Sequence, residues 1–338
     1  DLLTSCTAER REDILLPATD IVLADEPDVV FGPVGTLTEP YYNEPLWMMS
    51  GGITPNPSVV IAAKLRHDSS QVRVAVSTDL SFSDPVYSES KAAALAENNL
   101  VLKWRVPGLQ ANGSYFYAVE ADGSLYTTST GTFRTWGTEA MDFNFGVGSC
   151  ERNMNNGYSG AVVYNNPIWD VCRAGDLHFF LHAGDLHYWN NNTDSRVPYQ
   201  TSYDYIFSEA AHRQMFLEVP LFYMYDDHDY GPNDSDRTTP GRDACLSVYR
   251  DVVPHPQLPA GDGTAPTYYT FRVGRCQFIV TDLRSMHDPN ATVDGGSKTM
   301  MGTTQKAGWK QQVLQANADA DIGAIFWVTT VGFTGVAS

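Results

Sequence analysis

The stretch from His178 to Tyr188 reads HFFLHAGDLHY, an apolar run followed by a polar turn. A short apolar run of this kind predicts a buried strand over 178–183, and Gly184-Asp185 predicts the turn that ends it. Two other stretches, 143–148 and 221–225, also read as strands that run into polar residues. Helix-like patterns at 161–172 and 203–217 separate the three strands. This alternation of strand, polar turn and helix is typical of a layered α/β domain.

Further elements are expected on both sides of this stretch. Towards the C-terminus, strands are predicted at 278–282 and 324–331, with a helix over 304–318 between them. Between Trp47 and Trp136, turn-rich stretches separate four short β-rich runs, at 59–65, 72–76, 100–104 and 115–119. Short strands at this spacing predict an antiparallel β-sandwich. No cysteine lies in that region, so it cannot be a disulfide-pinned immunoglobulin domain.

The length of the chain, 338 residues, exceeds the usual size of one hydrophobic core. We therefore expect an extended lead segment at 1–44, a β-sandwich at 45–137 and the α/β domain at 138–338. The first segment mixes Pro, Gly and acidic residues without a clear period, so no regular element is predicted there.

Acidic residues dominate the charge, because 40 Asp and Glu stand against 22 Lys and Arg and give a net charge of −18. An acidic surface repels nucleic acid, and no basic arm offsets it, so no stable nucleic-acid partner is expected. The ordinary effect of such a charge is solubility, and only a local cluster of carboxylates would indicate bound cations. The longest apolar run, at 324–328 with its flanks, is far too short to span a bilayer.

Cysteines and glycosylation sequences indicate an exported protein. The five cysteines are Cys6, Cys150, Cys172, Cys245 and Cys276. In an oxidising compartment one of them should stay unpaired or bind metal, and if that one is Cys150, three disulfide pairings remain open for the other four. Acceptor sequences of the type Asn-x-Ser/Thr stand at Asn112, Asn191, Asn233 and Asn290. We expect glycans at Asn112 and Asn290, with Asn191 as a weaker candidate, in a secreted, extracellular or periplasmic protein.

Polar side chains follow the predicted strands at the points where the strands end. They are Cys150, Asp185, Asp226-Asp227 and Asp282. In open α/β sheets, ligands gather at the carboxyl ends of strands, because the loops there converge on one crevice. Several acidic groups in one crevice repel one another unless metal ions fill the site. The pattern therefore predicts a metal site.

The candidate ligands suit two unlike metals. A thiolate from Cys150 and a phenolate from Tyr188 suit iron, whereas carboxylate and amide oxygens within Asp226–Asp234 suit calcium, magnesium or manganese. Each feature alone has an ordinary explanation, since Gly-Asp is common turn chemistry and a single cysteine is often a buried hydrophobe or half a disulfide. His182 and His187 are interpreted as structural histidines. Three carboxylates around His228 make a poor core, which favours a functional site.

Several motifs occur in one order along the chain. They are Gly148-Ser149-Cys150, Gly184-Asp185-x-x-Tyr188, Asp226-Asp227-His228-Asp229 with Asn233-Asp234, Asp282-x-Arg284, and Gly302-x-x-Gln305-x-x-x-Trp309. Together they resemble the PhoD-like family of alkaline phosphatases and phosphodiesterases, within the calcineurin-like metallophosphoesterase superfamily. Ser50-Gly51-Gly52 and Gly131-Thr132-Phe133-Arg134-Thr135 also look like that family's N-terminal domain. The resemblance covers roughly residues 45–335 and implies a layered α/β/β/α metallophosphoesterase domain behind the β-sandwich.

The resemblance also implies roles for single residues. Cys150, Asp185 and Tyr188 match positions that hold ferric iron, with Asp185 bridging to a second metal. Asp227 stands where the wider superfamily has a metal-binding Asn, and Asn233 matches a calcium-side ligand that Asp226 supports, so Asn233 should carry no glycan. His228 would donate a proton to the leaving oxygen or stabilise the phosphoryl charge. Arg284 is a candidate phosphate clamp, although an Arg at this place could equally pair with Asp282.

The activity implied is hydrolysis of phosphate mono- or diesters by metal-activated water, with Fe³⁺ and one or two Ca²⁺ ions, or other divalent cations, as cofactors. The family's last metal ligands lie on loops beyond the strand expected at 324–331, and none of the residues up to Ser338 supplies them. Either the chain is a piece of a longer protein or its site is incomplete. In the second case the alternative is a non-catalytic extracellular glycoprotein that keeps the fold as a structural or assembly scaffold.

Overall fold

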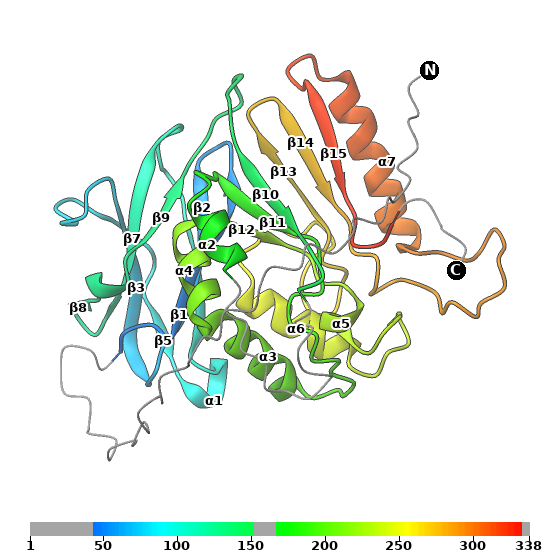
Figure 1. Cartoon of the computed structure of the whole chain (residues 1–338), viewed down its shortest axis with the longest axis horizontal. Helices are drawn as coiled ribbons and strands as arrows, with labels where there is room; N and C mark the ends of the chain where they lie inside the picture. Colours follow the sequence, from blue (N-terminus) through cyan, green and yellow to red (C-terminus); the bar gives the residue numbers. More distant parts are fainter. Residues whose placement is uncertain (1–42, 152–166, 333–338) are drawn as a thin grey trace, which may run out of the picture. The chain divides into compact units, whose positions relative to one another are not determined.

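The computed structural model describes residues 43–151 and 167–332. Cys6, most of the lead segment expected at 1–44 and the first half of the helix expected at 161–172 lie outside the described residues. All described residues belong to one compact unit, which starts at Thr38. Their helices and strands form a mixed α/β fold (Figure 1).

One six-stranded sheet contains the parallel strands that the sequence predicts. In spatial order it consists of β10 (Phe145–Gly148), β11 (Phe179–His182), β12 (Leu221–Tyr223), β1 (Trp47–Thr54), β2 (Ser58–Lys64) and β6 (Val101–Val106). β10, β11, β12 and β1 are parallel to one another, whereas β2 is antiparallel to both β1 and β6. The carboxyl ends of β10, β11 and β12 therefore lie at one edge of the sheet, where loops can converge.

A second sheet is built from other β-rich runs ahead of residue 138. It contains β4 (Val86–Tyr87), β3 (Ser69–Ser77), β7 (Ser114–Ala121) and β8 (Ser124–Leu125), with β5 (Lys91–Ala93) and β9 (Gly131–Arg134) paired on it. η1 (Thr127–Ser129) connects β8 to β9, and α1 (Leu95–Asn98) connects β5 to β6 of the first sheet. Its pairs are antiparallel, as expected. Because β1 pairs with β12, however, the first sheet crosses the boundary expected at 137/138. The domain boundaries at 44/45 and 137/138 stay a prediction.

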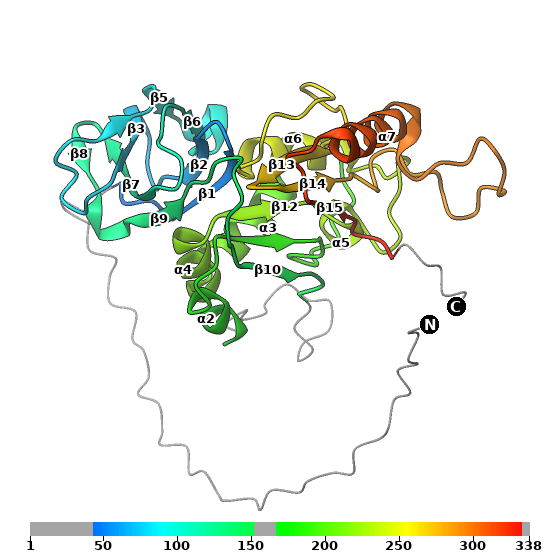
Figure 2. The same ribbon diagram turned by 90° about the horizontal axis from the view of Figure 1, so that it is seen from above.

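The third sheet packs face to face with the first. It consists of β13 (Tyr269–Val273), β14 (Cys276–Val280) and β15 (Ala324–Val328), and α7 (Gly302–Ala318) packs on β14 and β15. Aromatic rings join the two sheets, with Phe179 and Phe278 centroids 5.6 Å apart. On the other face of β11, Phe180 contacts Trp169 of α2 (Ile168–Arg173), with centroids 5.3 Å apart. The layers are thus α7, β13–β15, β10–β12 and α2 (Figure 2).

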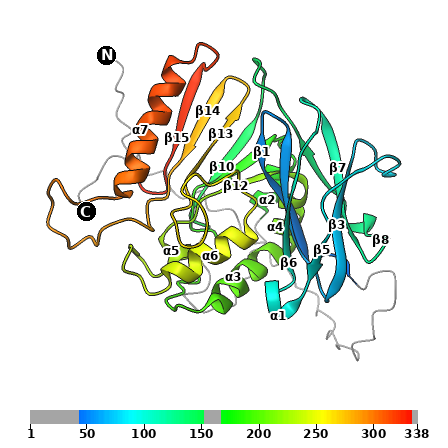
Figure 3. The same cartoon turned by 180° about the vertical axis from the view of Figure 1, so that it is seen from behind.

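The single helix expected over 203–217 is two helices, α3 (Arg196–Ser208) and α4 (Ala210–Glu218). Glu209 separates them, because its φ of −60° and ψ of 136° are extended rather than helical. α4 packs on β1 and α2, and α3 packs on α6 (Arg242–Val252), which the sequence reading did not predict (Figure 3). A one-turn helix, α5 (Asp227–Tyr230), starts four residues after β12 ends.

The cysteines, glycosylation sequences and apolar segments can be compared directly with the expectations. Cys150, Cys172, Cys245 and Cys276 are free thiols, so none of the described cysteines forms the expected disulfides with another, and any pairing of Cys6 lies outside the described residues. Asn112 and Asn290 are exposed, whereas Asn191 is buried and its amide donates to Ser202 Oγ at 3.1 Å. Within 43–151 and 167–332, no helix has the length and apolar character needed to cross a membrane.

His182, at the end of β11, should make the stability of the protein depend on pH. The side chain is 1% exposed, and its burial, followed by the charges of His212 and His187, lowers its pKa from 6.5 to about 3. Below pH 6.5 the His182 imidazole is protonated in the unfolded chain but stays neutral in the folded chain. As the pH is lowered from 6.5 to about 3, the free energy of unfolding should therefore decrease by about 1.4 kcal/mol per pH unit.

The substitution His182→Phe tests this expectation, because Trp169 and Tyr223 already surround the ring with aromatic groups. Urea unfolding of the variant between about pH 6 and pH 4.5 should show a slope shallower by about 1.4 kcal/mol per pH unit than that of the wild type. An unchanged slope would mean that His182 takes up a proton in the folded state.

Candidate metal centre

The structure places the predicted strand-end residues Cys150, Asp185 and Asp226-Asp227 close together. Hydrogen bonds continue the β10–β11 pairing beyond the strands, because Cys150 N–H donates to Gly184 O at 3.0 Å and Glu151 N–H donates to Asp185 O at 2.9 Å. This backbone pairing carries Cys150 alongside Asp185. Their side chains then meet, with Cys150 Sγ 3.6 Å from Asp185 Oδ2.

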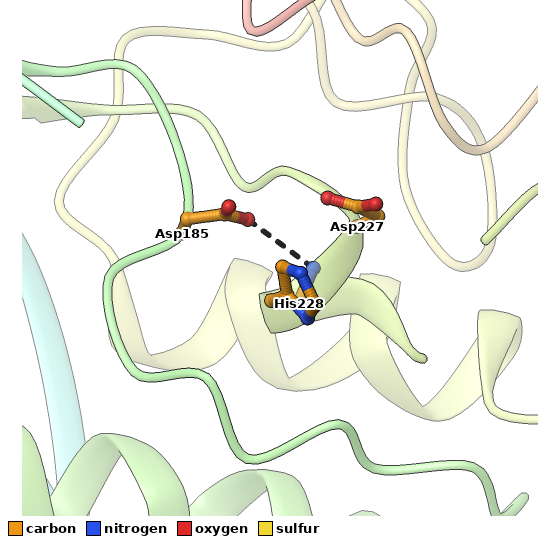
Figure 4. Close-up of side chains that lie close together, drawn as sticks. All are labelled: Asp185, Asp227 and His228. Atoms are coloured by element: carbon orange, nitrogen blue, oxygen red, sulfur yellow. Dashed lines mark hydrogen bonds between the residues drawn. The ribbon is translucent and has the colours of Figure 1, made fainter. Parts of the chain in front are cut away.

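Asp185, Asp227 and His228 form the centre of the site. One potential ligand atom from each lies within 4.8 Å of those of the other two, and all three residues are buried. Figure 4 shows the side chains of Asp185 and Asp227 on either side of His228, whose backbone N–H donates to Asp185 Oδ1 at 3.2 Å. Two carboxylates at this spacing can bind a cation, and the imidazole beside them can either bind it too or move a proton.

Gly184 allows the loops after β11 and β12 to approach closely. Its φ is +90°, and a Cβ there would lie 2.4 Å from Asp226 Cβ and 2.8 Å from Asp226 N. Any other residue would force the two loops apart, and with them Asp185 and Asp227.

Asp229 joins the loops after β11 and β12 through hydrogen bonds to their backbones. Its side chain is fully buried, and Oδ2 accepts hydrogen bonds from Asp185 N at 2.7 Å and Asp226 N at 3.2 Å. Its Oδ1 accepts from Leu186 N at 2.8 Å and His187 N at 3.0 Å. With Asp226 it also forms the reciprocal capping box that starts α5. Asp229 thus orients the backbone that presents Asp185 and Asp227.

Three of the predicted ligand residues have strained backbones. Cys150, Asp185 and Tyr188 have φ values of 56°, 59° and 50°, in the left-handed region that side chains disfavour by roughly 1–2 kcal/mol. Such strain persists only where the surrounding structure enforces it, and it concentrates at functional sites.

Tyr188 packs directly on His228. Their rings are stacked, with centroids 4.3 Å apart and an interplanar angle of 27°. On the edge of the imidazole, His228 Nδ1 lies 2.5 Å from Asn190 Oδ1. Tyr188 and Asn190 therefore fix the face and the edge of the His228 ring.

Arg284 is buried against the acidic cluster rather than paired with Asp282. Its Nε donates to Asp226 Oδ1 at 2.5 Å, and Nη2 lies 3.5 Å from Asp227 Oδ1. Its Nη1 donates to Ser235 O at a long 3.4 Å. Thr330 Oγ1 also donates to Asp226, at 2.9 Å, so Asp226 is held by a cation and a hydroxyl.

Asp282 and Asn233 are not brought into the cluster. Asp282 is completely buried and accepts hydrogen bonds from Tyr225 at 2.6 Å and Thr267 N at 3.1 Å, which makes it a structural anchor. Asn233 is exposed, and its amide nitrogen donates to Asp234 Oδ2 at 2.7 Å. Only the next residue reaches the site, because Asp234 N–H donates to Asp227 Oδ2 at 2.6 Å. Asn233 as a metal ligand stays a prediction.

The electrostatics of the cluster fit a bound cation. Burial, and then the charges of Asp229 and Asp227, raise the pKa of Asp185. Burial also raises the pKa of the Cys150 thiol and of the Tyr188 phenol, and the negative charge of Asp185 adds to both shifts. Each shift means that burial and the neighbouring carboxylates disfavour the anionic form of the group, which a positive charge nearby would favour. A metal ion would supply that charge and release the thiol and phenol protons.

Asn190 and Thr330 are site residues that the sequence reading did not single out, and Asp229 was counted only as one of the three carboxylates around His228. Asp229 stands inside the quoted Asp226–Asp229 cluster, where its adjacency was a usable signal. Asn190 lies in an Asn-rich run that reads as a glycosylation stretch, and Thr330 follows a strand far along the chain, so neither gave a signal of its own.

Comparison with known proteins identifies the family. The PhoD-like phosphatase N-terminal domain matches residues 46–137, and the PhoD-like phosphatase domain matches residues 145–327. No curated protein sequence matches the chain significantly.

Solved structures share the fold. A structure of PhoD matches with a TM-score of 0.68 and 18% identity over 85% of this chain and 62% of that one. The purple acid phosphatase PPD1 from yellow lupin (Lupinus luteus) seeds matches with a TM-score of 0.57 and 13% identity, over 84% of this chain and 50% of that one. This chain thus spans less than two thirds of the length of either, and at these identities the likeness concerns the fold. Since the second family domain alone covers more than half of the residues, the chain belongs to the PhoD-like phosphatase family.

Proposed function

We propose that this protein is a metal-dependent hydrolase of phosphate monoesters or diesters. The observation that carries the proposal is the convergence of Asp185, Asp227 and His228, with potential ligand atoms within 4.8 Å of one another at the carboxyl ends of β11 and β12. Membership of the PhoD-like phosphatase family supports the same reaction class.

The metals proposed are ferric iron and calcium. Cys150, Asp185 and Tyr188 would hold the iron, and Asp227 would hold the second cation, with Asp226 and Asn233 on that side. When bound, such ions lower the pKa of a water molecule and offset the charge on the phosphoryl group. The contact between Cys150 and Asp185 supports the iron-side set, whereas the exposed amide of Asn233 gives the calcium side less support.

The chain's own residues would position the ester and move the proton. His228, stacked on Tyr188 and held at Nδ1 by Asn190, presents its other nitrogen as the donor to the leaving oxygen. Arg284 carries a fixed positive charge beside Asp226 and Asp227. Its two Nη contacts are long, at 3.4 and 3.5 Å, so these groups can turn to a phosphoryl oxygen and act as the proposed clamp.

We further propose that the protein acts outside the cytoplasm. The exposure of Asn112 and Asn290 supports glycans there, and peptide mapping of protein from a eukaryotic secretory host tests both. Burial of Asn191 and its bond to Ser202 argue against a glycan at that position. The four described free thiols give this part of the proposal no support.

Replacing His228 by alanine should lower turnover of an alkyl phosphate monoester or an alkyl phosphate diester by about a hundredfold or more, because a positioned proton donor is lost. Elemental analysis should find wild-type metal content in the variant, since Asp185 and Asp227 remain. The measurement needs protein supplied with both iron and calcium.

Two outcomes would contradict the proposal. Wild-type protein that hydrolyses neither substrate faster than its variants would remove the enzyme assignment and leave the scaffold alternative, with the cluster as a structural metal site. A His228→Ala variant with full turnover would remove the role given to this histidine.

A further inference from the structure

The half-buried residue Asn190 makes two polar contacts with His228. Its side-chain Oδ1 lies 2.5 Å from His228 Nδ1, and its backbone N–H donates to His228 O at 3.2 Å. One residue thus contacts both the ring and the backbone of His228. Asn190 lies on the loop after β11, whereas His228 lies in α5 after β12, so these contacts join two separate loops of the site.

The orientation of the Asn190 amide is settled by its second partner. Its Nδ2 donates to the carbonyl oxygen of Tyr188 at 3.0 Å, and a carbonyl can only accept. The atom facing His228 is therefore the amide oxygen, which carries no proton. It follows that His228 Nδ1 must carry the hydrogen, whether the ring is neutral or charged.

The backbone of Asn190 is suited to this task. Its φ is 54°, in the left-handed region where Asn is better tolerated than most residues other than Gly. The loop reaches this position directly after Tyr188, which covers the face of the same imidazole and has a left-handed φ of 50°. Two residues of the same strained turn therefore contact the His228 ring: Tyr188 on its face and Asn190 at its edge.

We propose that Asn190 is the positioning residue for His228: it fixes the tautomer with the proton on Nδ1 and leaves Nε2 for the chemistry of the site. The proposal rests on the function proposed above. If His228 donates a proton through Nε2, the donor is the imidazolium with both nitrogens protonated, and the neutral ring left after donation must be the Nδ1–H tautomer in the same orientation.

The matched variant is Asn190→Gly, because Gly accepts the left-handed backbone and only the side chain is lost. Asn190→Asp is the conservative variant, because it keeps an acceptor oxygen for Nδ1–H and also tolerates this backbone. Asn192→Gly, at an exposed neighbouring position, is the control for adding a glycine to the loop.

The first readout is spectroscopic and does not need turnover. In the full chain, reloaded with diamagnetic zinc and labelled with ¹⁵N-histidine, two-bond nitrogen–proton spectra distinguish the two tautomers, and His228→Gln assigns the signal. Wild type, Asn190→Asp and Asn192→Gly should show His228 with its proton on Nδ1. Asn190→Gly should show a mixture of tautomers or the other tautomer.

The second readout is the dependence of kcat on the leaving group. Alkyl leaving groups need protonation, whereas nitrophenolates depart without it. Asn190→Gly should therefore lose about ten- to a hundredfold in kcat on an alkyl phosphate, with KM little changed. On 2,4-dinitrophenyl phosphate it should lose much less, and Asn190→Asp should recover most of the loss.

The outcomes separate this inference from the proposed function. An Asn190→Gly protein whose His228 keeps the Nδ1–H tautomer would overturn the inference, and so would a wild type with the proton on Nε2. An equal kcat loss on both substrates would also count against it. If wild type lacks activity but Asn190→Gly still changes the tautomer, the positioning role stands and the proposed function fails.

Discussion

Replacing Asp185 by asparagine should remove both metal binding and phosphate-ester turnover while leaving the chain folded. Asparagine keeps the size of the side chain and tolerates the left-handed backbone at this position, where φ is 59°, so the change is close to a pure loss of charge. Asp185 lies 3.6 Å from Cys150 Sγ and shares the centre of the site with Asp227 and His228. We expect turnover to fall by about a thousandfold, since a catalytic cation contributes several kcal/mol to the transition state.

Metal analysis and visible spectroscopy provide the independent measurements. The charge-transfer absorption that a thiolate or phenolate would give with ferric iron should disappear in Asp185→Asn together with the iron. Asp176→Asn is the matched control, because Asp176 also has a left-handed φ, of 50°, but is exposed and pairs with Arg134 away from the cluster. Wild-type metal content in Asp185→Asn would exclude Asp185 as a ligand.

Asp229→Ala should cost the protein about 4 kcal/mol or more in the free energy of unfolding. Its carboxylate accepts four backbone N–H groups, and all four bonds are buried or lie at the buried start of α5. Each donor left without a partner costs about 1–3 kcal/mol, and disruption of a buried hydrogen-bond network is one of the few changes with losses this large. Asp229→Asn should lose less, because it keeps one acceptor oxygen.

The control for Asp229 is Asp294→Ala. The Asp294 side chain is 94% exposed and pairs with Lys298 on the surface, so its loss should leave the free energy of unfolding almost unchanged. Urea unfolding followed by circular dichroism compares the two variants. A loss of under about 1 kcal/mol for Asp229→Ala would show that the two loops are held by other contacts.

The sequence predicted the elements around the site better than the contacts within it. The runs ahead of Cys150, Asp185 and Asp226 are strands, because apolar runs broken by polar turns follow local rules. The order of these strands in the sheet depends on pairing between segments that are distant in the sequence. Only the alternation of strands and helices suggested such an order. α6 was missed, although it packs on α3 and its buried residues Cys245, Val248, Tyr249 and Val252 recur at helical spacing.

Asp282 and Asp229 show where local reasoning stopped. Asp282 follows a strand just as Asp185 does, but its oxygens are taken by Tyr225, 57 positions away in the sequence, and by Thr267. Asp229 was grouped with the residues expected to form the functional site, yet its oxygens accept hydrogen bonds from the backbone of another loop. Whether a carboxylate faces a ligand or an amide is decided by partners that the sequence around it does not contain.

The parallel contact between β1 and β12 has a consequence for how such a protein can change over generations. Gly51 stands opposite Leu221 in this contact, and a Cβ at Gly51 would lie 2.3 Å from Leu221 O. A recombination point between the two family-matched regions would leave β12 as an open edge, a ready template for pairing with other chains. The two regions therefore have to evolve together, and an exchange of the first region for that of a related protein must preserve a glycine at position 51.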